Sequence, residues 1–343
     1  MVAKFNSAGL SKRLGLISLL IFSLVLGGCS TNNTASNSSD DNSQKVISIG
    51  ISQIIEHPAL DSAREGFIDA LKSKGYEPDK NISIDTQFAQ GDIALTSTIA
   101  QNFVSQNKDL ILAISTPSAQ SAKNSTNEIP ILFTAVTDPV AAGLVKDINS
   151  PRENITGTSD LSPIIKELEL GQMLFPNAKN IGVMFNTSEV NSQVQLDMAK
   201  EAAKELSINI VEIPVTNTSE IEAALSSKIK EIDYLFLPSD NLVASSLPMI
   251  AKIATDNKIG IIGVDEPMIK SGALACEGVD FYRLGHQTGL MAVNIFEGKE
   301  IKELPVSTLK ETQLIINEDV AKKLEIEIPQ DLLSRATIIK GGN

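Results

Sequence analysis

Residues 110–119, LILAISTPSA, decide the fold class of this chain. Leu110–Ile114 is an apolar run that ends in turn-forming residues, which predicts a buried strand of a parallel sheet. Thr116 suits the N-cap of a following helix, and Pro117 suits the first helical position. The unpaired amides of that first turn, together with the helix dipole, favour an anion such as a carboxylate. Ligands of open α/β sheets bind at this edge, although an ordinary strand-to-helix turn would have the same pattern.

The same strand–helix unit recurs on both sides of this stretch. Strands that alternate with helices of about 10–15 residues indicate parallel pairing through right-handed crossovers. The predicted strands are Val46–Ser52, Asn81–Phe88, Leu110–Ile114 and Ile129–Thr134, and then Asn180–Phe185, Ile208–Pro214, Tyr234–Leu237 and Gly260–Gly263. The sequence therefore predicts an α/β fold with two similar lobes, each a parallel sheet flanked by helices.

The order of the predicted elements also suggests where the lobes divide. The first series of strands ends near Gly157–Ser162, and a helix at Tyr282–Glu297 and a strand at Gln313–Asn317 follow the second. A tail that returns to the first lobe and then re-enters the second gives residues 45–157 plus 280–302 for lobe 1, and 158–279 plus 303–343 for lobe 2. Such crossings form a hinge, and the ligand is expected between the lobes.

The N-terminal segment has the pattern of an export signal over residues 1–28. Lys4, Lys12 and Arg13 precede an apolar run, Leu14–Leu26, that is too short to span a bilayer. The following Leu-Gly-Gly-Cys29 resembles a bacterial lipobox, so we expect a lipid on Cys29 that anchors the protein without spanning the membrane. A buried N-terminal helix would leave the cations and the Gly-Gly-Cys break unexplained. Residues 29–44 are rich in Ser, Thr, Asn and Asp, and predict a flexible tether.

Composition excludes several classes of function. The formal net charge is −13, which argues against nucleic acid or anionic lipid as a partner. Two cysteines, Cys29 and Cys276, and two histidines, His57 and His286, cannot supply a disulfide framework or a Cys/His metal site. The chain also has no G-x-S-x-G, H-E-x-x-H or P-loop motif. We therefore expect no catalysis, no cofactor and no metal.

Polar residues follow most of the predicted strands. If these strand ends face one cleft, they form a small site with both hydrogen-bond donors and carboxylates. Each of them can instead cap a turn or helix, which is what Ser, Asp and Asn do at such positions. The strand-end groups are Glu56–His57, Ser115–Thr116, Thr137–Asp138, Asn186–Ser188, Ser239–Asn241 and Asp265–Glu266.

Several consecutive motifs resemble one family. EHPALDSAREGF at residues 56–67 looks like the first loop and helix of ABC-transporter substrate-binding proteins of the tryptophan/tyrosine type. The other matching motifs are AQGD at 89–92, ISTPSAQ at 114–120, FTAVTDP at 133–139, GTSD at 157–160, NTSEVNS at 186–192, SDN at 239–241 and GHQTG at 285–289. The resemblance extends from about Val46 to Leu324. One departure is Ile114-Ser-Thr, where Ala-Thr is more usual in the family.

The resemblance implies a type I periplasmic-binding fold, no catalysis, and an amino acid, tyrosine or tryptophan, held between the lobes and delivered to a membrane permease. We expect a monomer on the outer face of the cell membrane. Other ligand-binding candidates are Thr137, Asp138 and Asn241. We assign the ligand carboxylate to Ser115, Thr116 and Ser118, and the ammonium to Asp240 or Asp265, with Glu189 next. Asn186, Asn191 and Ser192 would close over the ligand, and Ile55, His57, Phe88 and Phe133 would form the apolar slot.

Other interpretations remain open at this stage. Asp240 and Asp265 could merely cap helices. A sugar or nucleoside binder of the same fold would need more stacking aromatics and Arg/Asp pairs, and arginine is scarce here. A ligand-sensing transcription factor would need a DNA-binding head, which residues 30–44 cannot form. A surface adhesin or sensor leaves no motif, so it remains an alternative function.

Overall fold

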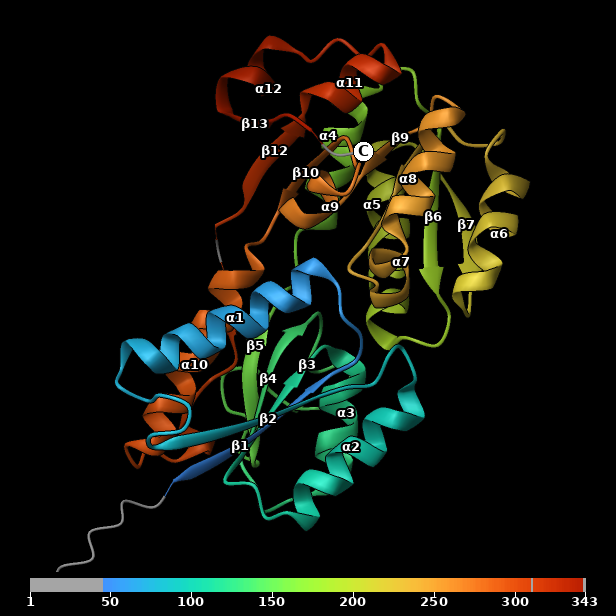
Figure 1. The fold of residues 1–343 in the computed structure, drawn as a ribbon. Helices are drawn as coiled ribbons and strands as arrows, with labels where there is room; N and C mark the ends of the chain where they lie inside the picture. Colours follow the sequence, from blue (N-terminus) through green and yellow to red (C-terminus); the bar gives the residue numbers. More distant parts are fainter. Residues whose placement is uncertain (1–45, 310, 342–343) are drawn as a thin grey trace, which may run out of the picture. The chain divides into compact units, whose positions relative to one another are not determined.

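The computed structural model describes residues 46–309 and 311–341, which form two α/β lobes (Figure 1). The predicted α/β class with two mostly parallel sheets is confirmed. The expected export signal, the tether and Cys29 lie outside the described residues. Among the residues that are described, no helix is long and apolar enough to cross a membrane.

The first lobe contains a sheet whose described strands all pair in parallel. Their spatial order is β11 (Ser307–Thr308), β5 (Ile155–Ser159), β4 (Ile131–Val136), β3 (Leu110–Ile114), β1 (Ile47–Gln53) and β2 (Ile82–Phe88). The predicted strand Leu110–Ile114 is fully buried in the middle of this sheet. The loops after β1, β3 and β4 therefore leave the same edge next to one another.

The helices of the first lobe cover both faces of its sheet. α1 (Pro58–Ser73) and α10 (Phe281–Phe296) lie side by side, and α2 (Ile93–Ser105) packs with α3 (Thr116–Ser125) (Figure 1). α1 and α10 approach closely because glycines form the contact. A Cβ on Gly285 would lie 1.8 Å from the carbonyl oxygen of Ala63, and one on Gly66 would lie 2.1 Å from that of Tyr282. The GHQTG motif therefore joins the late helix to the first one.

The second lobe repeats this plan with a larger sheet. β10 and β12 are antiparallel, whereas the other described pairs are parallel. The order is β13 (Thr337–Ile339), β12 (Gln313–Asn317), β10 (Ala275–Gly278), β9 (Gly260–Ile262), β8 (Tyr234–Phe236), β6 (Asn180–Asn186) and β7 (Asn209–Val215). The helical elements are α4 (Ile164–Leu174), α5 (Val190–Leu206), α6 (Ile221–Lys228), α7 (Asn241–Ser245), α8 (Leu247–Asp256), α9 (Glu266–Lys270), α11 (Glu318–Leu324) and α12 (Gln330–Arg335), with short 3₁₀ turns at Thr218–Glu220 and Ile301–Glu303.

Each lobe has its own hydrophobic core, and the chain passes between them where the cores end. Ile155 and Phe281 belong to the first core, whereas Ile164 and Cys276 belong to the second. β5 continues to Ser159, and β11 pairs with it in the first sheet. The first sheet therefore extends beyond the expected limits at 157 and 302, because a strand partner of β5 follows the late helix.

Candidate functional site

A small inner cavity lies between the two lobes, at the carboxyl edges of their sheets. Its volume in this structure is about 20 Å³. From the first lobe and the end of β5 come His57, Leu60, Ala135, Thr137, Asp160 and Phe281; from the second come Asn191, Ser239, Asp240, Asn241, Ala244, Asp265 and Met268. Eight of these residues are polar, so the walls combine hydrogen-bonding groups with an apolar part.

The start of α3 lies on the same sheet edge, between the elements that follow β1 and β4. The predicted N-cap is wrong by one residue: Ser115 is the N-cap, and Thr116 is the first helical residue. Ser115 has φ 84° and ψ 161°, a conformation that is strained for any residue except glycine. The hydroxyls of Ser115, Thr116 and Ser118 are buried and find no hydrogen-bond partner among the described residues. These free hydroxyls beside a helix N-terminus suit an anion.

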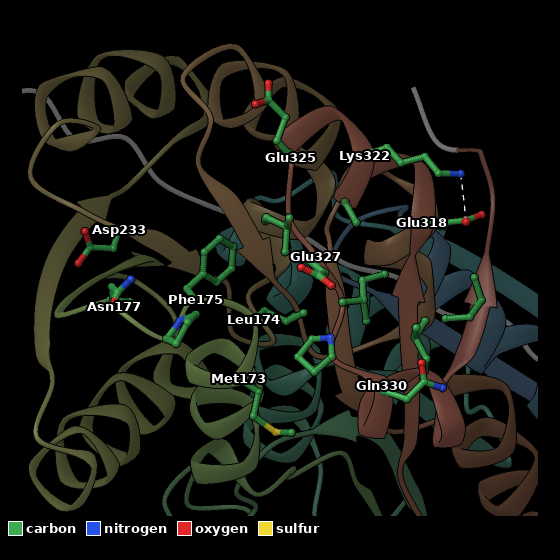
Figure 2. A pocket seen from close by; sticks show the side chains of 18 of the residues that line it. Met173, Leu174, Phe175, Asn177, Asp233, Glu318, Lys322, Glu325, Glu327 and Gln330 are labelled. Atoms are coloured by element: carbon green, nitrogen blue, oxygen red, sulfur yellow. Dashed lines mark ion pairs between the residues drawn. The ribbon is translucent and has the colours of Figure 1, made fainter.

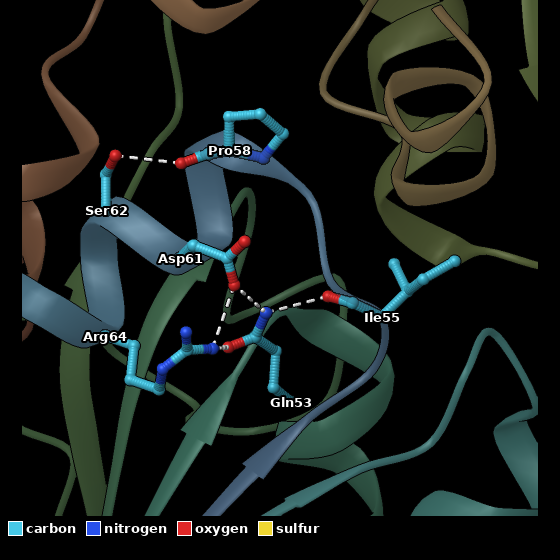
Figure 3. A network of polar contacts seen from close by, with 6 residues as sticks. All are labelled: Gln53, Ile55, Pro58, Asp61, Ser62 and Arg64. Carbon is cyan, nitrogen blue, oxygen red and sulfur yellow. Dashed lines mark hydrogen bonds and ion pairs between the residues drawn. The ribbon is translucent and has the colours of Figure 1, made fainter.

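The loop between β1 and α1 is fixed by a polar network (Figure 3). Buried Gln53 donates from Nε2 to the carbonyl of Ile55 at 2.8 Å and to Asp61 at 3.0 Å. Arg64 donates to Gln53 at 2.5 Å and to Asp61 at 2.9 Å. Because both ends of the Gln53 amide are engaged, the loop that carries His57 into the cavity is held in one conformation.

Two of the aromatic residues expected in the apolar slot lie elsewhere. The ring of Phe88 is half-buried beneath the guanidinium of Arg64, 5.1 Å from its centroid, and does not line the inner cavity. Phe133 lies in the core of the first lobe. The apolar wall is instead formed by Leu60, Ala135, Ala244, Met268 and Phe281.

The turn after β4 separates two neighbouring candidates. Asp138 caps this turn, since its carboxylate accepts from the amides of Val140 and Ala141, each at 2.9 Å. Thr137 lines the cavity, and its hydroxyl accepts a hydrogen bond from Gln195 of the second lobe at 3.2 Å. Gln195 also exchanges hydrogen bonds with the backbone of Ser239. The two lobes are therefore in direct polar contact across the site.

Asp160 and Asp265 are buried carboxyl groups in the cavity wall. Burial raises the pKa of Asp160 to about 6, although hydrogen bonds with Thr137 and Ser239 act in the opposite direction and lower it. Burial also raises the pKa of Asp265 to about 7, and the nearby charge of Asp160 adds to this effect. Asp265 caps α9 through the amide of Met268 at 2.7 Å, and Oδ1 of Asp160 has no partner within the described part of the chain. A cation between these groups would stabilise their ionised forms.

Asp240 is engaged entirely within the second lobe. One of its oxygens accepts from the amide of Asn186 at 2.5 Å and the hydroxyl of Ser192 at 2.7 Å. The other accepts from the amide of Val243 at 2.9 Å, so Asp240 is the N-cap of α7. Burial raises its pKa. These bonds assign Asp240 to the framework of the site.

Glu189 gathers three asparagine side chains of the second lobe. It accepts from Asn186 at 3.1 Å, from Asn191 at 3.0 Å and from Asn241. Burial, and then the charge of Asp240, raises the pKa of Glu189 to about 7. Oδ1 of Asn191 is buried without a partner in the described residues, and this side chain lines the cavity. Glu189 therefore orients Asn191, whose unpaired oxygen belongs to the cavity wall.

Two further spaces lie outside the inner cavity. An outer space of about 190 Å³ lies beside the inner cavity and is lined by Ile55, Gln90, Asn186, Glu189, Thr216–Thr218 and Asn241. A larger groove is formed by the end of α4 and the C-terminal segment, where Glu318 pairs with Lys322 (Figure 2). Its residues Asn177 and Asp233 precede β6 and β8, so this groove lies at the amino edge of the sheet. None of the strand-end candidates from the sequence lines it.

Sequence reasoning missed Asp160 and Gln195 as site residues, and it named Ser239 only as part of the strand-end group Ser239–Asn241. Asp160 follows β5, which the sequence pattern indicated only as a break between lobes. Gln195 lies inside α5 in the sequence, so it does not follow a strand end and the strand-end pattern could not indicate it. The GTSD and SDN motifs contain Asp160 and Ser239, so the motif matches carried a signal. Among residues 46–309 and 311–341, no His, Cys, Asp and Glu cluster could hold a metal ion.

Comparisons with known proteins agree with this architecture. The chain matches the family model of ABC transporter substrate binding proteins over residues 48–340. It is 50% identical over 320 residues to the Tyrosine-binding protein of Clostridioides difficile (strain R20291), covering 91% of this chain and 92% of the relative. The chain therefore belongs to the family of ABC transporter substrate-binding proteins, and the resemblance seen in the sequence is confirmed. Members of this family are binding proteins, not enzymes, that work outside the cytoplasm and deliver a small ligand to a permease.

Two solved structures relate to the arrangement of the lobes. An ABC domain from Streptococcus pneumonia in complex with L-Trp is 32% identical, with 86% of this chain and 100% of that chain covered and a TM-score of 0.83. The ligand-free, open structure of a substrate-binding protein with adhesive properties from Clostridium difficile is 49% identical with the same coverage, yet its TM-score is 0.66. The less identical, ligand-bound structure superposes better. Together with the Gln195–Thr137 bond, this indicates closed lobes in the present structure.

Proposed function

We propose that this chain is a lipid-anchored binding protein that captures a free L-amino acid, tyrosine or tryptophan, between its lobes and delivers it to an ABC permease. The observation that carries the proposal is a pair of complementary polar sets at the carboxyl edges of the two sheets, with Ser115–Ser118 and Asp160 on the first sheet and Asp265 on the second. Unpartnered hydroxyls lie at the start of α3, and buried carboxyls lie at Asp160 and Asp265. A zwitterion supplies the anion and the cation that these sets lack.

The hydroxyls are assigned to the ligand carboxylate. Ser115, Thr116 and Ser118 supply neutral donors, and the amides of the first turn of α3 add the positive end of the helix dipole. Charge-assisted hydrogen bonds of this kind are stronger than those between neutral groups. Backbone amides would hold any carboxylate, so this part of the site binds the group that all amino acids share and does not select among their side chains.

The ammonium is assigned to Asp265 and Asp160. Each is almost completely buried, at 3% and 4% exposed, and each lines the cavity. Asp240 and Glu189 support this pair indirectly, because their oxygens already accept bonds from the protein. A charged pair in a water-poor cleft is stabilised more than an exposed one.

The ligand side chain is assigned to the apolar wall around Leu60, Met268 and Phe281. An aromatic side chain that buries about 150–250 Å² contributes about 4–6 kcal/mol at 25 cal/mol per Å². The names of the two relatives, one tyrosine-binding and one in complex with L-Trp, support an aromatic ligand. The lipobox at Cys29 supports a lipid anchor that keeps the protein, as a monomer, beside its permease.

The direct test is to identify and titrate the ligand. Protein purified without denaturant is analysed by mass spectrometry for released small molecules, and refolded protein is titrated with the standard L-amino acids. We expect tyrosine or tryptophan in the first experiment and the tightest binding of the same amino acid in the second. Ser118→Ala should weaken binding, whereas Ser125→Ala, whose hydroxyl bonds the Ser121 carbonyl later in α3, should not. Failure of every amino acid to bind would refute the proposal.

Adhesion is a second candidate function. A relative that is 49% identical is described as a substrate-binding protein with adhesive properties. Deletion of the protein followed by separate uptake and attachment assays would distinguish the two functions. A loss of attachment with normal uptake of aromatic amino acids would favour adhesion.

A further inference from the structure

His57 lies between the polar and the apolar walls of the inner cavity. The side chain is 8% exposed, and its neighbours in the wall include Leu60, Ala244 and Met268. His57, Ala244 and Met268 also line an adjoining small space of about 10 Å³. The imidazole is therefore a polar group at the apolar end of the site, where the ligand side chain is assigned.

The hydrogen bonds of its neighbours define which nitrogen of His57 is free. The ring has a hydrogen bond with Asn241, while Nε2 is buried and without a partner in the described chain. The side-chain nitrogen of Asn241 donates to Glu189, and the bond between Asn241 and the ring raises the pKa of His57, as expected when the Asn241 oxygen accepts from the imidazole. The bond to Asn241 therefore uses Nδ1–H, and Nε2 carries a lone pair. Burial lowers the pKa of His57 to about 4, so the ring is neutral at physiological pH.

We propose that Nε2 of His57 accepts a hydrogen bond from a donor at the tip of the ligand side chain, and so makes the site selective for a phenol or indole over a phenyl ring. This inference rests on the proposed function, because it requires an aromatic amino acid in the cavity. A phenyl ring would leave Nε2 buried and unpaired beside apolar groups, which is unfavourable. Sites built to bond a polar group reject the analogue that lacks it far more strongly than apolar pockets reject an extra methylene.

The same contacts couple recognition of the side chain to closure. His57 belongs to the first lobe, whereas Asn241 and Glu189 belong to the second. The Nδ1–H bond that sets the ring orientation therefore forms only when the lobes meet. A ligand with the correct donor can bond Nε2 in the proposed orientation only in the closed state. Its binding therefore shifts the population toward that state.

The test is a calorimetric comparison of three ligands: L-tyrosine, L-phenylalanine and 4-fluoro-L-phenylalanine, which has nearly the shape of tyrosine but no donor. We expect the wild-type protein to bind tyrosine at least about tenfold more tightly than either analogue. His57→Phe should reduce this ratio to within about twofold, and His57→Gln, which retains an acceptor, should keep part of it. His286→Phe is the matched control, since this half-buried histidine of α10 lies beside Tyr282 outside the cavity.

The outcomes separate this inference from the proposed function. If no aromatic amino acid binds the wild-type protein, the proposed function itself is wrong. If all three ligands bind but the wild-type ratio is below about twofold, or if His57→Phe keeps the full ratio, the role of His57 is refuted while the proposed function stands. The wild-type comparison needs no variant, so the inference remains testable even if His57→Phe does not fold.

Discussion

Replacing Asp160 by asparagine should weaken ligand binding and stabilise the ligand-free protein at the same time. Asp160 is 4% exposed, and its Oδ1 has no partner in the described structure. Asparagine has the same shape and can retain the hydrogen bonds with Thr137 and Ser239, but it cannot neutralise an ammonium group. The substitution therefore removes the charge and little else.

The magnitude on stability follows from the pKa of this carboxyl. A rise from 3.8 to about 6 corresponds to about 3 kcal/mol against the ionised form in the folded protein. Because the folded pKa is raised, the folded state binds more protons than the unfolded state between these values, and stability falls as pH rises through this window. At pH about 7 the destabilisation is fully present. Asp160→Asn should therefore stabilise the closed, ligand-free form by up to about 3 kcal/mol, and by less where the lobes open and water reaches the carboxylate.

The magnitude on binding has the opposite sign. Loss of a buried charged partner leaves the ligand cation unpaired, which typically weakens binding by about 2–5 kcal/mol. Calorimetry with the best amino acid should show at least a tenfold loss of affinity, and chemical denaturation without ligand should show the gain in stability. Asp92→Asn is the control, since Asp92 is an exposed cap of α2 away from the cavity. Wild-type affinity in Asp160→Asn would refute the assignment.

Four further predictions concern separate parts of the molecule. Ser115→Gly should be more stable than Ser115→Ala by up to about 3 kcal/mol, because glycine adopts φ 84° without strain. Both variants lose the hydroxyl, so equal melting temperatures would contradict this prediction. Gln195→Ala should leave the ligand-free lobes more open in X-ray scattering, because the 3.2 Å hydrogen bond to Thr137 is lost. An unchanged scattering profile would show that this bond does not hold the lobes together. Affinity should fall as pH is lowered from about 8 to about 5, since protonated Asp160 and Asp265, with pKa values of about 6 and 7, cannot pair with an ammonium; a flat profile would exclude this role. Cys29→Ser should release the protein from membranes or leave it unprocessed, and unchanged mass and fractionation would exclude lipidation.

Some elements could be predicted from the sequence, because their burial pattern is local. Leu110–Ile114 and Gln313–Asn317 have the predicted bounds. β10 and β5 could not be predicted in this way. β10 is Ala-Cys-Glu-Gly, which has no apolar run, and it forms because β9 and β12 lie on either side of it. Short strands of this kind depend on tertiary pairing more than on propensity.

The candidate site could be predicted in position but only partly in roles. Polar groups at strand ends were expected to meet at one cleft, and His57, Thr137, Asn191, Asp240 and Asp265 do line the inner cavity. The sequence could not separate residues that bond the protein from those that remain free, because Asp is an equally good cap and ligand. That distinction depends on distances. Three protein donors lie within bonding distance of Asp240, whereas one oxygen of Asp160 has none in the described chain.

The free polar groups also explain why a ligand should favour closed lobes. Buried donors and acceptors in folded proteins are almost always paired, because an unpaired one loses its bonds to water without replacement. In this closed structure the hydroxyls of Ser115, Thr116 and Ser118, and one oxygen each of Asp160 and Asn191, are buried without partners in the described residues. Opening the lobes would let water reach such groups, and closing around a zwitterion would pair several of them. Closure is therefore unfavourable when the cleft is empty and favourable when it is filled, so capture and release follow from the hydrogen-bonding needs of the cleft itself.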